Sequence, residues 1–155
     1  MSARLFETLI KGLCLMHKLD VDHVLAGRAV EMGGVQFSFA HVTDSEGSAD
    51  SGSPLLTMYC EFGVVPRHLE GQVYAKLLQA NLSACTDHGE TYCLSSDGRV
   101  ILANSYLLDV LTPELLTGFM TMTAALANHW RKGYFLEQGK ARGTRQQAGL
   151  NVNKA

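Results

Sequence analysis

Residues 66–82 carry two apolar stripes, where an ordinary surface helix carries one. Pro66 suits a first helical turn, and no further proline follows until Pro113. At about 100° per residue, two sets of small or apolar side chains fall on nearly opposite sides of this predicted helix. The first stripe comprises Leu69, Val73, Leu77 and Ala80, and the second comprises Gly71, Tyr74, Ala75, Leu78 and Leu82.

A helix with two apolar stripes has to be covered on two sides. A chain of 155 residues can hardly bury one helix on all sides within a single subunit. We therefore predict that the first stripe faces the sheet of its own subunit and the second faces a partner subunit, while the pattern alone also permits the reverse assignment. The predicted dimer interface comprises Gly71, Tyr74, Ala75, Leu78 and Leu82.

Alternating apolar and polar residues predict strands on either side of this helix. Gly33-Gly34 predicts a tight hairpin turn, because glycine tolerates the positive φ angles of such turns. The predicted strands are residues 28–32, 35–42, 55–63, 91–95 and 99–105, and a first helix is predicted over residues 3–18. Helix, three strands, helix, two strands and a last helix indicate an α+β domain with a mainly antiparallel, twisted sheet packed by helices.

The last helix has a strong start signal. Thr112 offers a hydroxyl N-cap, Pro113 suits the first helical position, and Glu114 places an acid in the first turn. We expect this helix to pack on the sheet through a single apolar stripe. Its centre is predicted to be Leu115, Phe119, Met122, Leu126 and Trp130, widened by Leu116, Met120 and Ala127.

Composition and charge limit the class of protein. Hydrophobic residues make up 46% of the chain and charged residues 18%, which is ordinary for a soluble globular domain, and no apolar run is long enough for a membrane span. Residues 1–137 hold all 15 acidic residues and 9 Lys/Arg, a formal charge of −6 that does not suggest nucleic-acid binding. We predict one domain over residues 1–137, a basic tail without fixed structure over 138–155, and a cytoplasmic location.

Candidate chemistry is sparse. Cys85, His88 and Cys93 form a C-x2-H-x4-C pattern, but a zinc site usually needs four ligands in paired short spacings. The same residues leave open a small cytoplasmic metal- or thiol-dependent enzyme. The polar loop over residues 43–54 carries acidic residues, yet their spacing does not fit an EF-hand. None of the common nucleophile, zinc-protease or nucleotide-binding motifs occurs, so the sequence supports no catalytic site and no cofactor.

Three short motifs within residues 69–132 resemble the class I type III secretion chaperones, a Tir-chaperone-like family of small bacterial proteins. The family's helix end, L-L-x-A-N, occurs at residues 77–81. Its strand and turn, L-x-x-D-G-x-V-x-L, occur at residues 94–102, and its A-x-x-W helix end at residues 127–130. The order of predicted elements over residues 3–132 also agrees with the family.

The resemblance implies a homodimer of α+β subunits without enzymatic activity or cofactor. Each dimer would bind the N-terminal region of a secreted effector and keep it partly unfolded and competent for secretion. The same motifs also fit a related dimeric protein-binding module outside secretion. The family has no signature for effector contacts, so strand and helix periodicity supplies the candidates, with the core as the alternative reading. The predicted effector-binding residues are Leu5, Leu9, Val35, Phe37, Phe39, Met58 and Phe62.

Overall fold

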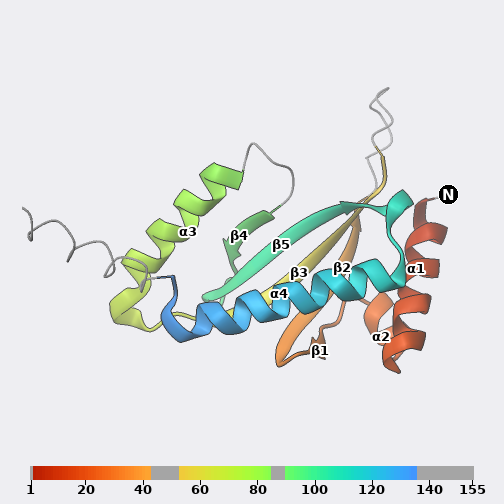
Figure 1. Ribbon diagram of the computed structural model, residues 1–155, viewed down its shortest axis with the longest axis horizontal. Coiled ribbons are helices and arrows are strands. Elements are labelled where there is room, and N and C mark those ends of the chain that lie inside the picture. The colour runs from red at the N-terminus through yellow and green to blue at the C-terminus, as the bar shows by residue number, and fades with distance from the viewer. Residues whose placement is uncertain (1, 43–52, 85–89, 136–155) are drawn as a thin grey trace, which may run out of the picture.

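The computed structural model describes residues 2–42, 53–84 and 90–135 (Figure 1). The predicted order of three longer helices and five strands is confirmed, with one additional short helix, α2. The helices are α1 (Ser2–His17), α2 (Val21–Leu25), α3 (Glu70–Ala84) and α4 (Pro113–Gly133). The strands are β1 (Val30–Met32), β2 (Val35–Val42), β3 (Leu55–Val64), β4 (Glu90–Leu94) and β5 (Arg99–Leu107). The predicted loop over residues 43–54 lies almost wholly outside the described residues, as does the predicted tail over 138–155.

The five strands form one antiparallel sheet in the order β1-β2-β3-β5-β4. The turn between β1 and β2 is the predicted one, with φ angles of 61° at Gly33 and 75° at Gly34. Both angles lie in the left-handed region that favours glycine. The long pairing between β3 and β5 shifts register between Glu61 and Gly63, which marks an irregularity at one end of the sheet. In the order of this sheet, β1 and β4 are the two edge strands.

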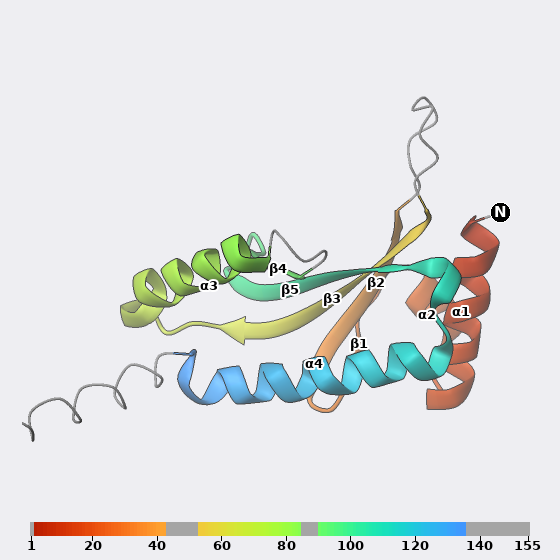
Figure 2. The ribbon, with the colours of Figure 1, turned by 45° about the horizontal axis from the view of Figure 1, so that its top comes forward.

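One face of the sheet forms most of the core. The register places Phe39 of β2, Met58 of β3 and Asn104 of β5 side by side, and all three are buried. Helix α4 packs on β3, β2 and β1, while α1 crosses one end of the domain and contacts α4 (Figures 1 and 2). Helix α3 lies at the other end, against β4. The protein thus presents a helix at each end of the sheet.

Helix α2 was not predicted, because the run after Asp20 is too short to show helical periodicity. Its local signal is the N-cap: the Asp20 carboxylate accepts hydrogen bonds from the backbone N–H groups of Asp22 and His23, at 2.9 and 3.2 Å. Side-chain caps of this kind satisfy donors that have no partner within the helix. Val24 is the buried anchor of this helix.

Helix α4 begins as predicted but buries a different face. The Thr112 hydroxyl accepts a hydrogen bond from the Leu115 N–H at 3.2 Å, which confirms the cap. The prediction is wrong for Leu115, which is 49% exposed, and for Met122, which is 72% exposed, whereas Trp130 and the three residues predicted to widen the face are buried. The buried face of α4 comprises Leu116, Met120, Thr123, Ala124, Ala127 and Trp130. The apolar arc of α4 is wider than its contact with the sheet, so one side of the arc stays in solvent.

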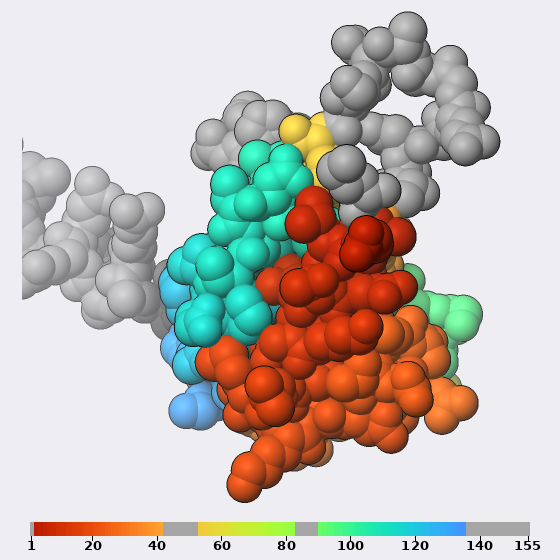
Figure 3. All heavy atoms as spheres, turned by 90° about the vertical axis from the view of Figure 1, so that its right-hand side faces the viewer, coloured from red at the N-terminus to blue at the C-terminus, as the bar shows by residue number. Residues whose placement is uncertain are grey.

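Helices α1 and α4 approach each other closely at Gly12. A Cβ atom at this position would lie 2.6 Å from Cγ of Pro113, closer than two carbon atoms can pack. Nearby, the His17 ring nitrogen Nε2 and the Thr117 hydroxyl are hydrogen bonded at 2.8 Å. Figure 3 shows α1, in red, packed directly against the teal residues around the start of α4. The absence of a side chain at Gly12 is therefore what permits this helix contact.

Candidate functional site

Helix α3 has one buried and one exposed apolar stripe. Pro66 precedes a single 3-10 turn, Arg67–Leu69, and the α-helix itself begins at Glu70. Val73 is fully buried and Leu77 is 5% exposed, so the stripe predicted to face the sheet is the buried one. Of the two assignments that the sequence permits, the structure therefore shows the one in which the first stripe is buried and the second is exposed.

The second stripe lies on the surface of the single subunit. Leu78 is 68% exposed and Leu82 is 75% exposed, values that are high for leucine. Gly71 and Ala75 are also exposed, and Tyr74 is half-buried. Two large aliphatic side chains one helical turn apart, with small residues beside them, form an apolar face that a second protein could cover.

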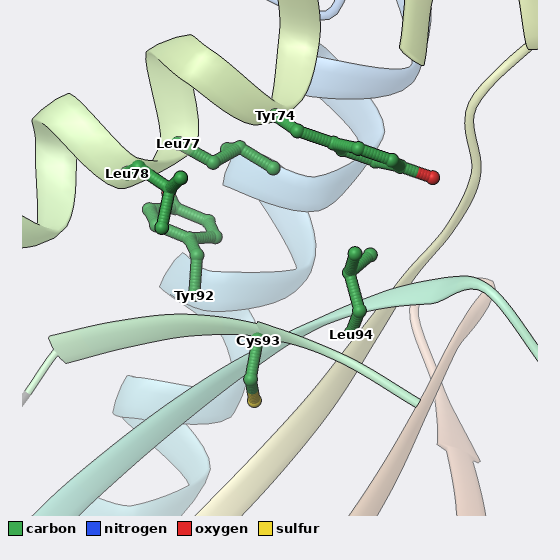
Figure 4. Close-up of a pocket in the computed structure, with 6 residues that line it drawn as sticks. All are labelled: Tyr74, Leu77, Leu78, Tyr92, Cys93 and Leu94. Carbon is green, nitrogen blue, oxygen red and sulfur yellow. The ribbon is translucent and has the colours of Figure 1, made fainter. Parts of the chain in front are cut away.

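An apolar groove of about 180 Å³ runs between this helix and strand β4 (Figure 4). It is lined by Tyr74, Leu77, Leu78, Tyr92, Cys93 and Leu94. Figure 4 shows the side chains of Tyr92 and Leu94 directed toward α3, whereas the sulfur of Cys93 is directed away from it. Tyr92 and Leu94 were not predicted as residues of this site, because the strand pattern gives no sign of a helix lying over them.

Two hydrogen bonds of the Asn81 side chain join α3 to the edge of the sheet. Its side-chain Nδ2 donates to the Tyr92 carbonyl at 2.8 Å, and its Oδ1 accepts from the Tyr92 N–H at 2.7 Å. Strand β4 is an edge strand, and because Asn81 binds both backbone groups of Tyr92, these groups point away from β5. The amide of Asn81 therefore occupies backbone groups that an exposed edge strand would otherwise offer to another chain. It also fixes the position of α3 over the groove.

Replacing Asn81 with alanine is expected to loosen α3 without unfolding the core. The change leaves both Tyr92 backbone groups without their side-chain partner, and the expected cost is about 2 kcal/mol in the free energy of unfolding. Amide hydrogen exchange at Tyr92 should accelerate by about tenfold or more. Gln72→Ala, at an exposed position on the same helix, is the matched control. An unchanged rate of amide exchange at Tyr92 would contradict the proposed role of Asn81 in holding α3 against β4.

The residues predicted to bind an effector lie mostly in the core. Leu5 is 44% exposed and is the one member of the set with a substantial surface. The buried members are Leu9, Val35, Phe37, Phe39, Met58 and Phe62. Strand alternation identified the apolar face correctly, but α1 and α4 cover that face within the same subunit. In this fold these six side chains belong to the core of the subunit and do not form an open surface.

The described residues give no support to the metal- or thiol-dependent reading. Cys85 and His88 lie outside them, and within the described part of the chain no group of three or more His, Cys, Asp or Glu is placed to hold a metal. Partial burial raises the pKa of the Cys93 thiol, and burial raises the pKa of Cys60 to about 12. A raised pKa keeps a thiol protonated at neutral pH and lowers its reactivity as a nucleophile.

The turn between β4 and β5 explains one of the recognised motifs. Gly98 has a φ of 80°, which favours glycine at that position. Arg99 donates from Nε to Asp97 at 2.8 Å and also pairs with Glu61 on β3. The hydrogen bond from Ser95 and the neighbouring Arg99 lower the pKa of the Asp97 carboxyl, which remains ionised at neutral pH. The D-G pair is thus a structural turn.

From β1 to near the end of α4, residues 31–131 match the Tir chaperone protein (CesT) family. The chain belongs to this family. CesT proteins are type III secretion chaperones and not enzymes, so the predicted family and the predicted lack of enzymatic activity are confirmed. No curated protein matches the chain. No helix among the described residues is long and apolar enough to cross a membrane.

The structure shows what the L-L-x-A-N and A-x-x-W motifs do in this member of the family. The L-L-x-A-N segment of this CesT family member supplies Leu77 to the core, Leu78 to the exposed stripe and Asn81 to the edge of β4. The A-x-x-W segment supplies Ala127 and Trp130 to the contact between α4 and the sheet. Both motifs therefore contribute residues to the packing of the single subunit.

Proposed function

We propose that this protein is a homodimeric type III secretion chaperone that acts in the bacterial cytoplasm. It binds the N-terminal region of a secreted effector and keeps that region partly unfolded until export. The observation that carries the proposal is the match to the CesT family across β1 to α4, on a fold with the predicted element order.

The homodimer is supported by the exposed face of α3. Leu78 and Leu82 are more than half exposed in the single subunit, and Leu78 also lines the groove between α3 and β4. A twofold dimer needs one self-complementary patch, and a helix with an aliphatic stripe flanked by Gly71 and Ala75 can pack closely against its own copy. Because Asn81 occupies the Tyr92 backbone groups in the middle of the β4 edge, the two subunits are expected to meet through helices and not through a continuous sheet.

Replacing Leu78 with glutamate is expected to split the dimer. The side chain is 68% exposed in the subunit, so the change should leave the fold intact while placing a charge in the proposed interface. Light scattering should give about twice 16.9 kDa for the wild-type chain and 16.9 kDa for the variant. Gln72→Glu, on the polar side of α3, should remain dimeric. A monomeric wild-type protein at micromolar concentration would overturn the proposed dimer.

The function itself is tested by the identity of the native partner. The chaperone should be purified from its native bacterium, with proteolysis of the bound complex followed by mass spectrometry. The expected result is a protected segment from the N-terminal region of a secreted protein, which fails to be exported when the chaperone is deleted. A stably bound partner that is not a secretion substrate would instead support a protein-binding module outside secretion.

A further inference from the structure

The chain turns sharply where α4 ends, through two residues with a left-handed backbone. Tyr134 caps the helix with a φ of 52°, and its N–H donates to the Trp130 carbonyl at 2.6 Å. Phe135 follows with a φ of 60°. One left-handed residue after a helix is common, but it is usually glycine, because a Cβ atom raises the energy of this conformation. Two successive aromatic residues in this conformation indicate that other contacts offset the strain.

Contacts between aromatic rings supply this offset. The ring of Tyr134 is perpendicular to that of Trp130, with centroids 4.8 Å apart and an interplanar angle of 90°. The ring of Phe135 meets that of Tyr92 edge to face, at 6.5 Å and 80°. Such pairs are favourable, and their energy is of the same order as the cost of a left-handed backbone. Tyr134 and Phe135, here called the aromatic turn, are thus held in place by Trp130 and Tyr92.

Tyr92 is also joined to α3. Its backbone N–H and carbonyl are hydrogen bonded by the Asn81 side chain, and its ring lines the groove together with Leu77 and Leu78 (Figure 4). The C-terminal end of α4 lies near the start of α3 in both ribbon views (Figures 1 and 2). Tyr92 is therefore in contact both with α3 and with the aromatic turn.

We propose that the aromatic turn is a two-state element whose packed state depends on the position of Tyr92, so that a movement of α3 is transmitted to the end of α4. In the packed state both rings keep their partners and both residues stay left-handed. In the unpacked state the rings leave Trp130 and Tyr92, and the backbone returns to negative φ angles, which relieves the strain. A shift of Tyr92 removes one of the contacts that offset the strain and so favours the unpacked state.

This coupling links the exposed stripe of α3 to the chain beyond α4. A protein that covers Leu78 and Leu82 and holds α3 against β4 favours the packed state, and by linkage the packed state favours binding of that protein. The backbone of Phe135 sets the direction in which the chain continues. Residues 136–155, with four basic residues and one acidic residue, follow directly. A contact made at α3 thereby changes the direction in which a basic segment leaves the domain.

The first test uses the full chain and NMR. Trp130 is the only tryptophan, so its indole N–H gives one reporter signal. This N–H is buried and has no acceptor among the described residues, so its exchange with solvent reports opening of its surroundings. Asn81→Ala should shift the signal and accelerate its exchange about threefold or more, because it frees Tyr92. Gln72→Ala, at an exposed position on α3, is the control and should change the rate by less than about twofold.

The second test measures the coupling in the opposite direction. Phe135→Ala removes the ring that contacts Tyr92 and should accelerate amide exchange at Tyr92 about threefold or more, because coupling is mutual. Lys132→Ala, at an exposed position in the last turn of α4, is the control and should leave this rate within about twofold.

A third comparison isolates the strain. Tyr134→Ala and Tyr134→Gly both remove the ring that contacts Trp130, but only glycine removes the cost of the left-handed backbone that directs Phe135 toward Tyr92. Amide exchange at Tyr92 should therefore be about fivefold faster in Tyr134→Ala than in Tyr134→Gly.

Several results would overturn the proposal. An unchanged Trp130 signal in Asn81→Ala, or an equal effect of Gln72→Ala, would show that the hydrogen bonds to Tyr92 do not control the aromatic turn. An unchanged rate at Tyr92 in Phe135→Ala would do the same, and this variant carries the test if Asn81→Ala does not fold. Equal rates in the two Tyr134 variants would remove the strain. None of these results bears on the proposed chaperone function, which depends on the identity of the native partner.

Discussion

Replacing Arg131 with methionine is expected to lower the free energy of unfolding by about 3 kcal/mol. The guanidinium donates to the carbonyls of Phe62 at 2.7 Å, Gly34 at 2.9 Å and Glu61 at 3.2 Å. It also donates to Oδ1 of Asn128 at 3.2 Å. Methionine keeps much of the apolar stem but leaves these acceptors without their charged donor. The effect is large because one side chain joins α4 to both the β1–β2 turn and the end of β3.

The measurement is urea denaturation at one fixed protomer concentration, because dimerisation would add to the apparent stability. Arg131→Lys keeps the charge but cannot reproduce the planar set of donors, so it should fall between the wild-type chain and Arg131→Met. Lys132→Met changes an exposed charge on the same turn and should cost less than about 0.5 kcal/mol. A loss below about 1 kcal/mol for Arg131→Met would contradict the assigned role.

Replacing Gly12 with alanine is expected to destabilise the chain by about 2 kcal/mol, although the same change usually stabilises a helix by about 1 kcal/mol. The new Cβ would lie 2.6 Å from Cγ of Pro113, in a rigid ring at the start of α4. The helices can accept the methyl group only by moving apart, which disturbs the packing between α1 and α4. The free energy of unfolding, measured by urea denaturation, reports this cost.

A double-mutant cycle isolates the contact between Gly12 and Pro113. In a Pro113→Ala background the offending Cγ is gone, and Gly12→Ala should then be neutral or stabilising by up to about 1 kcal/mol. Gly118→Ala on α4 is the matched control, because nothing lies within 4 Å of a Cβ at that position. Equal effects of Gly12→Ala in the two backgrounds would show that the close approach does not limit the helix contact.

Local chemistry made much of the fold predictable. The Thr112 cap, the Gly33-Gly34 turn and the strand alternation each depend on residues close together in the chain. The candidate site was predictable in part: the second stripe of α3 is exposed as an interface would require, and Leu78 and Leu82 are its most prominent members. The predicted effector-binding residues were chosen by the same alternation, which identifies an apolar face but not what covers it.

The long-range contacts had no comparable signal. Asn81 bonds Tyr92 across the connection between α3 and β4, and Arg131 reaches Phe62 from 69 residues away in the chain. A polar side chain in a helix is usually a surface residue, so neither role follows from the residue type. Both depend on where the sheet places a backbone carbonyl.

The sequence by itself determined the class of fold, the order of the longer elements and the family, because these depend on residue periodicity, caps and short motifs. Only the tertiary structure decided which side of each helix is buried. Helices α3 and α4 both carry apolar arcs wider than one contact with the sheet can cover. The position of the sheet selects Val73 and Leu77 on α3 and Leu116 and Met120 on α4. The remaining parts of those arcs, including Leu78 on α3 and Met122 on α4, stay exposed in the single subunit.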